Sequence, residues 1–92
     1  MMMTVSYDVH SDRARRRIFR LLKLYGEHVQ KSVFECDLTE RTLRDLRLRC
    51  AEEIDPATDS VRFYPLCASC RAKIEVMGTG PVPEEDEGFY IA

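Results

Sequence analysis

Two amphipathic helical segments, each following an extended segment, most strongly constrain the fold of this 92-residue chain. The first is predicted from a cap at Ser11 or Asp12 to about Tyr25, where Gly26 ends it. Its apolar stripe consists of Ala14, Ile18, Leu21, Leu22 and Tyr25. The second is predicted over 40–54 after a cap at Asp37 or Thr39, with the apolar set Leu43, Leu46, Leu48, Cys50, Ala51 and Ile54. Each helix therefore needs another layer to cover its apolar face.

Extended segments are predicted on either side of these helices because Val, Tyr and Phe recur there. They cover residues 3–9, 28–36, 61–66 and 73–77. This order indicates an α+β sandwich in which two helices lie on one face of an antiparallel sheet. One strand is expected between the helices, or two if the segment 28–38 bends.

The length and hydropathy of the chain indicate a single domain without a membrane span. Ninety-two residues make one domain with a small core, which self-association would help to stabilise. No apolar run approaches the roughly 20 residues of a membrane span. The start, "MMMTVSYD", lacks the basic region and long apolar stretch of a signal peptide. We therefore expect a cytoplasmic protein with no membrane partner.

The positive charge is concentrated near the start of the chain. Residues 1–34 carry a net charge of +4, although the whole chain carries −2. The basic residues of the first helix are Arg13, Arg15, Arg16, Arg17, Arg20 and Lys23. Arg15 and Arg17 flank the apolar stripe on opposite sides, and the others lie on the outer face. Such a face can bind phosphate, the alternative being an ordinary solvated helix surface.

The four cysteines predict no structural disulfide in a cytosolic chain. Cys36 and Cys50 fall in apolar patterns and are expected to be buried. The "CASC" at 67–70 is one C-x-x-C, whereas a zinc site needs four ligands. A thioredoxin-like motif follows the first strand of its fold, which does not match here. A turn-stabilising or buried pair is the favoured interpretation.

Three stretches, "YDVHSDRARRR", "YGEHVQKSVFECDL" and "DSVRFYPLCASC", occur in this order. Together they resemble the CRISPR-associated "Cas-two" family, the small adaptation endonuclease, over most of residues 3–78. The resemblance implies a ferredoxin-like domain over 1–78 that forms a homodimer. It also implies that 79–92, an acidic linker followed by "GFYIA", supplies a C-terminal strand that can be exchanged with the partner.

The resemblance further implies a site at the dimer interface. The acid that ends the first strand is Asp8, and two such acids, one from each chain, share a Mg²⁺ or possibly a Mn²⁺ ion. The residues that map onto the family's site are Asp8, Tyr7, Arg15, Arg17, Ser32 and Phe34. Arg15 and Arg17 are expected to steady the phosphate.

Elementary chemistry supports this assignment of Asp8. Mg²⁺ prefers oxygen ligands and is usually held by one or two carboxylates with water. A two-fold dimer supplies two carboxylates from one sequence position. The alternatives are that Asp8 is a plain strand-end acid and that Tyr7 and Phe34 belong to the core. His10, two residues beyond Asp8, is a further candidate proton carrier.

Two classes of function follow from these expectations. The first is a Mg²⁺-dependent endonuclease that cleaves RNA or DNA during spacer acquisition. The second is a non-catalytic dimeric adaptor that bridges the CRISPR integrase and spacer DNA, with the basic helix gripping the DNA backbone. A single-strand RNA-binding module is a weaker third interpretation, because "VRFYPL" has two aromatic residues without the motif typical of such modules.

Overall fold

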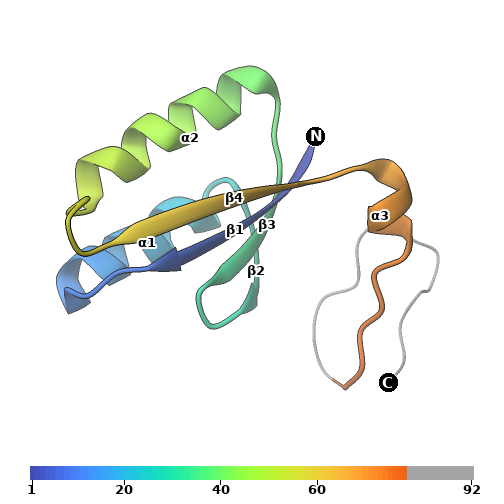
Figure 1. The fold of residues 1–92 in the computed structure, drawn as a ribbon, viewed down its shortest axis with the longest axis horizontal. Coiled ribbons are helices and arrows are strands. Elements are labelled where there is room, and N and C mark those ends of the chain that lie inside the picture. Colours follow the sequence, from blue (N-terminus) through green and yellow to red (C-terminus); the bar gives the residue numbers. More distant parts are fainter. Residues whose placement is uncertain (79–92) are drawn as a thin grey trace.

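A computed structural model of the chain describes residues 1–78 (Figure 1). The elements are β1 (Met2–Asp8), α1 (Asp12–Lys23), β2 (Gly26–Gln30), β3 (Val33–Asp37), α2 (Glu40–Glu53), β4 (Ser60–Leu66) and α3 (Ala68–Ala72). The first six follow the β-α-β-β-α-β order of a ferredoxin-like fold, which confirms the expected fold class.

The sheet has the strand order β2-β3-β1-β4, and every neighbouring pair is antiparallel. Side chains alternate across β1, so Met3, Val5 and Tyr7 are buried while the intervening residues face the other way. The helices α1 and α2 both pack on the buried face, where they contribute to one core. The largest fully buried side chains are Phe34, Ile18, Leu22, Leu46, Val5 and Cys36. Within residues 1–78, neither α1 nor α2 covers the opposite side of the sheet, which is called the uncovered face below.

Local capping explains where the two long helices begin. The Ser11 hydroxyl accepts a hydrogen bond from the Ala14 N–H at 3.3 Å. Thr39 and Thr42 form a reciprocal capping box, in which each side chain accepts from the other residue's N–H. These contacts confirm Ser11 and Thr39 among the predicted caps.

Two predicted features differ from the structure, and one alternative left open by the sequence is decided. The segment 28–36 is two strands, β2 and β3, joined by a turn at residues 31–32, so the open alternative of a bend is confirmed. The strand predicted at 73–77 is wrong, because residues 68–72 are helical and only an isolated bridge at Met77 follows. Leu48, expected in the core, is 63% exposed because α2 turns it toward solvent.

Three further expectations concern membranes, two of the cysteines and the end of the chain. Within residues 1–78, no helix is both long enough and apolar enough to cross a membrane. Cys36 and Cys50 are buried, as predicted. The acidic linker and the strand "GFYIA" at 79–92 lie outside the described residues, and their exchange with a partner stays a prediction.

Gly26 has a steric role that its position after α1 did not reveal. It opens β2 opposite Cys36 of β3, whereas Leu24 caps the helix. A Cβ atom at Gly26 would clash with the Glu35 carbonyl oxygen and the Cys36 sulfur. The close approach of two strands therefore requires glycine here.

We expect Gly26→Ala to lower the free energy of unfolding by about 1–3 kcal/mol, because the added methyl group forces β2 away from β3. Urea denaturation at one fixed protein concentration measures the change. Glu27→Ala, at the next and exposed position, is the matched control and should change stability by less than about 0.5 kcal/mol. Equal effects in the two variants would contradict the steric argument.

Candidate functional site

Asp8 ends β1 on the uncovered face, where its side chain is exposed. It lies opposite Ser60 of β4, and Arg62 lies on the same face opposite Ser6. The Tyr64 hydroxyl and, more weakly, the Asp8 carboxylate raise the pKa of Arg62. The carboxylate and the guanidinium are thus within electrostatic reach of each other at this end of the sheet.

The chain beside Asp8 is anchored by Asp59. Its carboxylate accepts hydrogen bonds from the His10 N–H at 3.0 Å and the Asp55 N–H at 2.9 Å, and it lies 3.2 Å from His10 Nδ1. The backbone N–H groups of Asp55 and His10 lower the pKa of Asp59 to about 2. The Asp59 side chain, only 4% exposed, therefore ties the end of β1 to the start of β4. His10 is held here as a partner of Asp59.

A second feature lies between α1 and the β2–β3 turn. It is a hollow of about 540 Å³, called the basic hollow below. Its lining residues are Tyr7, Arg15, Arg16, Phe19, Arg20, Lys23 and Lys31. Five of these side chains are basic and none is acidic, and the lining is otherwise aromatic. Such a surface suits a phosphate group or a nucleic-acid backbone.

The residues of the basic hollow are positioned by contacts beneath it. Tyr7 directs its hydroxyl toward the Lys31 carbonyl oxygen at 3.5 Å. Burial raises the pKa of Tyr7, and the nearby Arg15 partly offsets this. Arg15 itself donates to the Val9 carbonyl at 3.2 Å, while Lys23 Nζ lies 5.6 Å from the centre of the Phe19 ring. The hollow is therefore supported by backbone contacts as well as by packing.

The structure separates the predicted site residues into different places. Asp8 is on the uncovered face, whereas Tyr7 and Arg15 line the basic hollow on the other side of the sheet. Arg17 points instead toward α2, where its Nη1 lies 3.6 Å from Glu53 Oε2. Tyr7 and Arg15 therefore lie together in the basic hollow. Within one copy of the chain, neither Arg15 nor Arg17 lies on the same surface as Asp8.

Ser32 and Phe34 have structural contacts in the described chain. The Ser32 carbonyl accepts a hydrogen bond from the Tyr7 N–H at 3.1 Å, so the β2–β3 turn is attached to β1. Phe34 is 0% exposed, and its ring lies 5.5 Å from that of Phe19 and 6.4 Å from that of Tyr7. Phe34 therefore supports the wall of the basic hollow from within the core.

Sequence reasoning missed two groups of candidate residues. Ser60 and Arg62 lie beside Asp8 because β4 pairs with β1, and this pairing is a long-range contact. Lys31 reaches the basic hollow from the β2–β3 turn, which the predicted single strand concealed. The alternation of "SVRFYPL" does place Arg62 and Tyr64 on one face, which was the available signal.

The donor set at Asp8 fits Mg²⁺ only in part. A carboxylate oxygen is a suitable ligand, and Ser60 offers a hydroxyl on the facing strand. Among residues 1–78, no three His, Cys, Asp or Glu side chains converge as a metal-binding group. A metal site at Asp8 therefore needs a second carboxylate from another copy of the chain.

Comparison with known proteins identifies the family. Residues 1–74 match the family described as CRISPR associated protein Cas2. The chain belongs to the Cas2 family. A relative from Chloroflexus aurantiacus, named CRISPR-associated endoribonuclease Cas2 1, is 46% identical over 92 residues that cover 99% of each protein. A Thermus thermophilus relative, named CRISPR-associated endonuclease Cas2 2, is 48% identical over 87% of this chain and 84% of its own.

Solved structures agree with the Cas2 family assignment. A Thermus thermophilus protein described as hypothetical superposes with a TM-score of 0.81 at 46% identity, covering 90% of this chain and 96% of its own. Streptococcus pyogenes Cas2 superposes with a TM-score of 0.76 at 37% identity, covering 85% and 100%. The fold and the resemblance seen in the sequence are thereby both confirmed.

The hydrogen bonds of Asp59 predict a pH-dependent contribution to stability. Because its pKa is lowered in the folded chain, its contribution is present above the unfolded pKa near 4 and is lost as the pH falls toward about 2. Asp59→Asn should therefore lower the melting temperature at pH 7, and the difference from the wild type should shrink below pH 4. Calorimetry across pH 2–7 measures this; a constant difference would contradict it.

Proposed function

We propose that this chain is a metal-dependent endonuclease of the Cas2 type that acts as a homodimer in spacer acquisition. One observation carries the proposal: Asp8 is exposed at a strand end, and within residues 1–78 its carboxylate forms no ion pair or hydrogen bond. The names of the relatives, endoribonuclease and endonuclease, support the same class of activity. RNA and DNA are both candidate substrates.

The uncovered face is the proposed dimer interface. Its half-buried side chains include Thr4 of β1 and Glu35 of β3, which lie in one row with Tyr64 of β4. Burial and then the repulsion by Glu27 raise the pKa of Glu35, and the nearby Arg71 partly offsets this. In a two-fold contact through this face, a residue close to the axis meets its own copy, so two Asp8 carboxylates placed there can share one ion.

The roles of the residues follow from these positions. When bound, Mg²⁺ supplies a Lewis acid that eases deprotonation of water and stabilises charge on a phosphoryl oxygen. Asp8 holds the ion, and Arg62 donates to a phosphate oxygen of the bound strand. Asp59 keeps the end of β1 against the start of β4, which fixes the separation of Asp8 and Arg62.

We expect Asp8→Ala to reduce phosphodiester cleavage about 100-fold or more, because the ion loses its ligand from each copy. Labelled single-stranded RNA and double-stranded DNA are incubated with the purified protein in Mg²⁺, in Mn²⁺ and in EDTA. Asp45→Ala, which removes an exposed acid from α2, is the matched control and should cleave like the wild type. Cleavage by Asp8→Ala at the wild-type rate would overturn the metal site.

The basic hollow favours a second function, a dimeric adaptor that grips spacer DNA for the CRISPR integrase. Its five basic side chains lie on the far side of the sheet from Asp8, so they can bind a DNA backbone without joining in hydrolysis. Binding of this kind depends on charge and not on sequence. The two functions are compatible, since they use separate surfaces of one dimer.

Removing three cations from the hollow, Arg16, Arg20 and Lys23, should weaken duplex DNA binding at least about tenfold at low salt. The slope of log affinity against log salt should become shallower by roughly 0.9 for each phosphate that the variant no longer neutralises. Binding is measured by fluorescence anisotropy over a range of salt concentrations.

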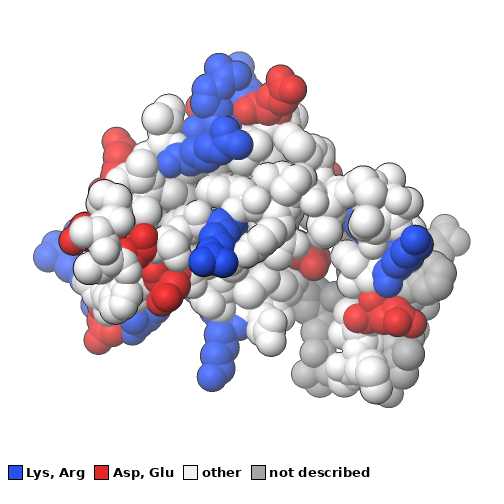
Figure 2. Space-filling model, in the orientation of Figure 1, with Lys and Arg blue, Asp and Glu red and all other residues white. Residues whose placement is uncertain are grey.

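The matched control is the alanine triple of Arg41, Arg44 and Arg47, which are exposed on α2. Figure 2 shows basic and acidic side chains next to one another over this helix, so its field is partly cancelled. This control removes the same charge but should weaken binding less. An equal decrease in affinity would mean that net charge alone, and not the basic hollow, determines binding.

A further inference from the structure

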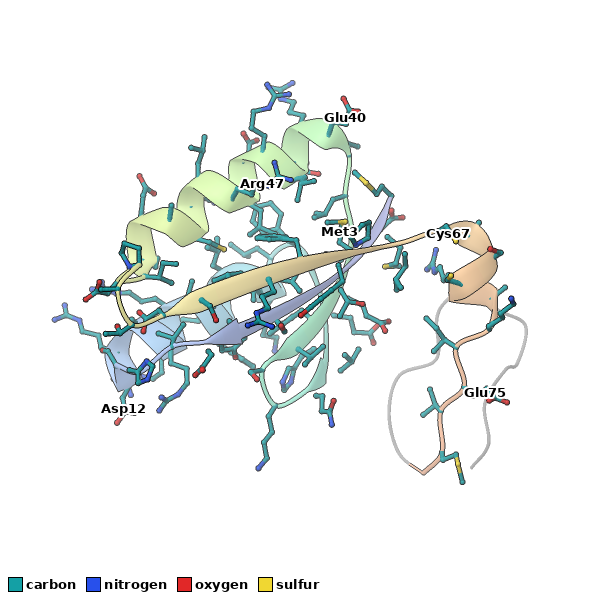
Figure 3. The ribbon with its side chains drawn as sticks, viewed as in Figure 1. Met3, Asp12, Glu40, Arg47, Cys67 and Glu75 are labelled. Atoms are coloured by element: carbon teal, nitrogen blue, oxygen red, sulfur yellow. The ribbon has the colours of Figure 1, made fainter. Side chains whose placement is uncertain are left out.

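The "CASC" pair occupies a place that the sequence did not predict. Leu66 ends β4 and Cys67 directly precedes α3, so the motif lies at a strand-to-helix junction. Cys67 and Cys70 are both exposed, so the pair is not buried, and that one of the two favoured interpretations is wrong. In Figure 3, Cys67 lies at the opposite end of the molecule from Asp12, away from the start of α1. The pair is therefore separate from both features described above.

The backbone places the two thiols next to each other. Cys67 is the N-cap of α3 with φ −73° and ψ 164°, and Cys70 is the third helical residue. Thr39 and Thr42 stand in the same relation at the start of α2, where Thr39 has φ −85° and ψ 170°. The hydroxyl oxygens of that pair lie 3.1 Å apart. The backbone angles at Cys67 are similar, although Cys67 makes no side-chain cap bond, and the thiols of Cys67 and Cys70 interact over this turn.

The surrounding groups shift the pKa values of the two thiols in opposite directions. Cys67 Sγ lies 3.2 Å from the Ser69 hydroxyl. This hydroxyl, followed by the N–H and the thiol of Cys70, lowers the pKa of Cys67 to about 7. The hydrogen bond to Cys67 raises the pKa of Cys70. Cys67 is thus the better nucleophile near neutral pH, and Cys70 is suited to act second, as the resolving thiol.

The other two cysteines differ in every respect that matters for reactivity. Cys36 and Cys50 are buried, and burial raises the pKa of each thiol to about 11. They lie in the core between the sheet and α2. Cys36 and Cys50 therefore serve as internal controls, because these two buried thiols should not react in the folded chain.

We propose that Cys67 and Cys70 form a reversible dithiol–disulfide pair that exchanges with small-molecule disulfides. The Cys67 thiolate attacks one sulfur of the disulfide, the S–S bond breaks, and one thiol leaves with a proton from solvent. Cys70 then loses its proton and attacks the Cys67 sulfur of the mixed disulfide, which releases the second thiol. The protein is oxidised by two electrons, and the small-molecule disulfide is reduced to two thiols.

The position of the pair gives its oxidation a structural consequence. α3 lies against the start of β1, where Ala68 and Arg71 share a hollow with Met2 and Asp37. Arg71 also lowers the pKa of Glu35 on the uncovered face, a smaller influence than burial or the repulsion by Glu27. A disulfide that closes the first turn of α3 therefore stiffens a segment that borders the proposed dimer interface.

The test treats the folded full-length chain with oxidised glutathione and locates the products by peptide mass mapping. We expect one internal disulfide between Cys67 and Cys70, reversed by a thiol reductant, with Cys36 and Cys50 left free. Cys70→Ser should instead stop at a mixed disulfide of glutathione on Cys67. Absence of the internal disulfide from the wild type, or equal modification of Cys36, would overturn the proposal.

A second measurement follows the alkylation of Cys67 by iodoacetamide as a function of pH. The rate should rise with a midpoint near pH 7, and at pH 7 it should exceed that of the urea-unfolded chain roughly fourfold. Ser69→Ala removes the hydroxyl beside the sulfur and should move the midpoint to higher pH. A midpoint at the ordinary thiol value in the wild type, unchanged in Ser69→Ala, would refute the assignment of Cys67 as the attacking thiol.

Discussion

The pairing of β1 with β3 on one side and β4 on the other determines most of what this chain can do. Because β1 lies inside the sheet, its alternating side chains divide the molecule into two sides. Val5 and Tyr7 face the helices and hold the core together, whereas Asp8 faces outward at the strand end. The same strand thus supports the packing of α1 and presents a carboxylate to whatever covers the sheet.

The elements that depend on local sequence could be predicted, and those that depend on neighbours could not. Ser11 and Thr39 mark helix starts because a cap is a contact over three residues. The β2–β3 turn at residues 31–32 was harder, since "KS" contains none of the Gly, Pro or Asn residues that usually signal a hairpin. The alternation of side-chain type along residues 28–36 continues through this turn, so the sequence pattern predicted one strand instead of two. α3 is only five residues long and leaves almost no periodic pattern.

The candidate site could also be predicted only in part: the sequence indicated Asp8 but not the grouping of the basic residues. The resemblance to the family identified Asp8 correctly as a strand-end acid, and its position on an uncovered face followed from alternation. The sequence did not show which arginines of α1 lie on the same surface. Adjacent residues of a helix are rotated by about 100°, so neighbouring arginines can face different parts of the molecule. Arg15 and Arg16 consequently border the basic hollow while Arg17 meets Glu53 of α2. Arg62 comes close to Asp8 only through the register of β1 against β4.

The placement of the basic hollow and the uncovered face on opposite sides of the sheet has a consequence for assembly. If two copies join through their uncovered faces, both hollows are turned outward, and the dimer becomes a bivalent ligand for one long polyanion. Once the first hollow is occupied, the second experiences a high effective concentration of the same duplex, and the avidity of the pair exceeds the affinity of either hollow. Duplexes long enough to span both hollows gain this advantage and shorter ones do not, so the dimer discriminates by length without reading a base.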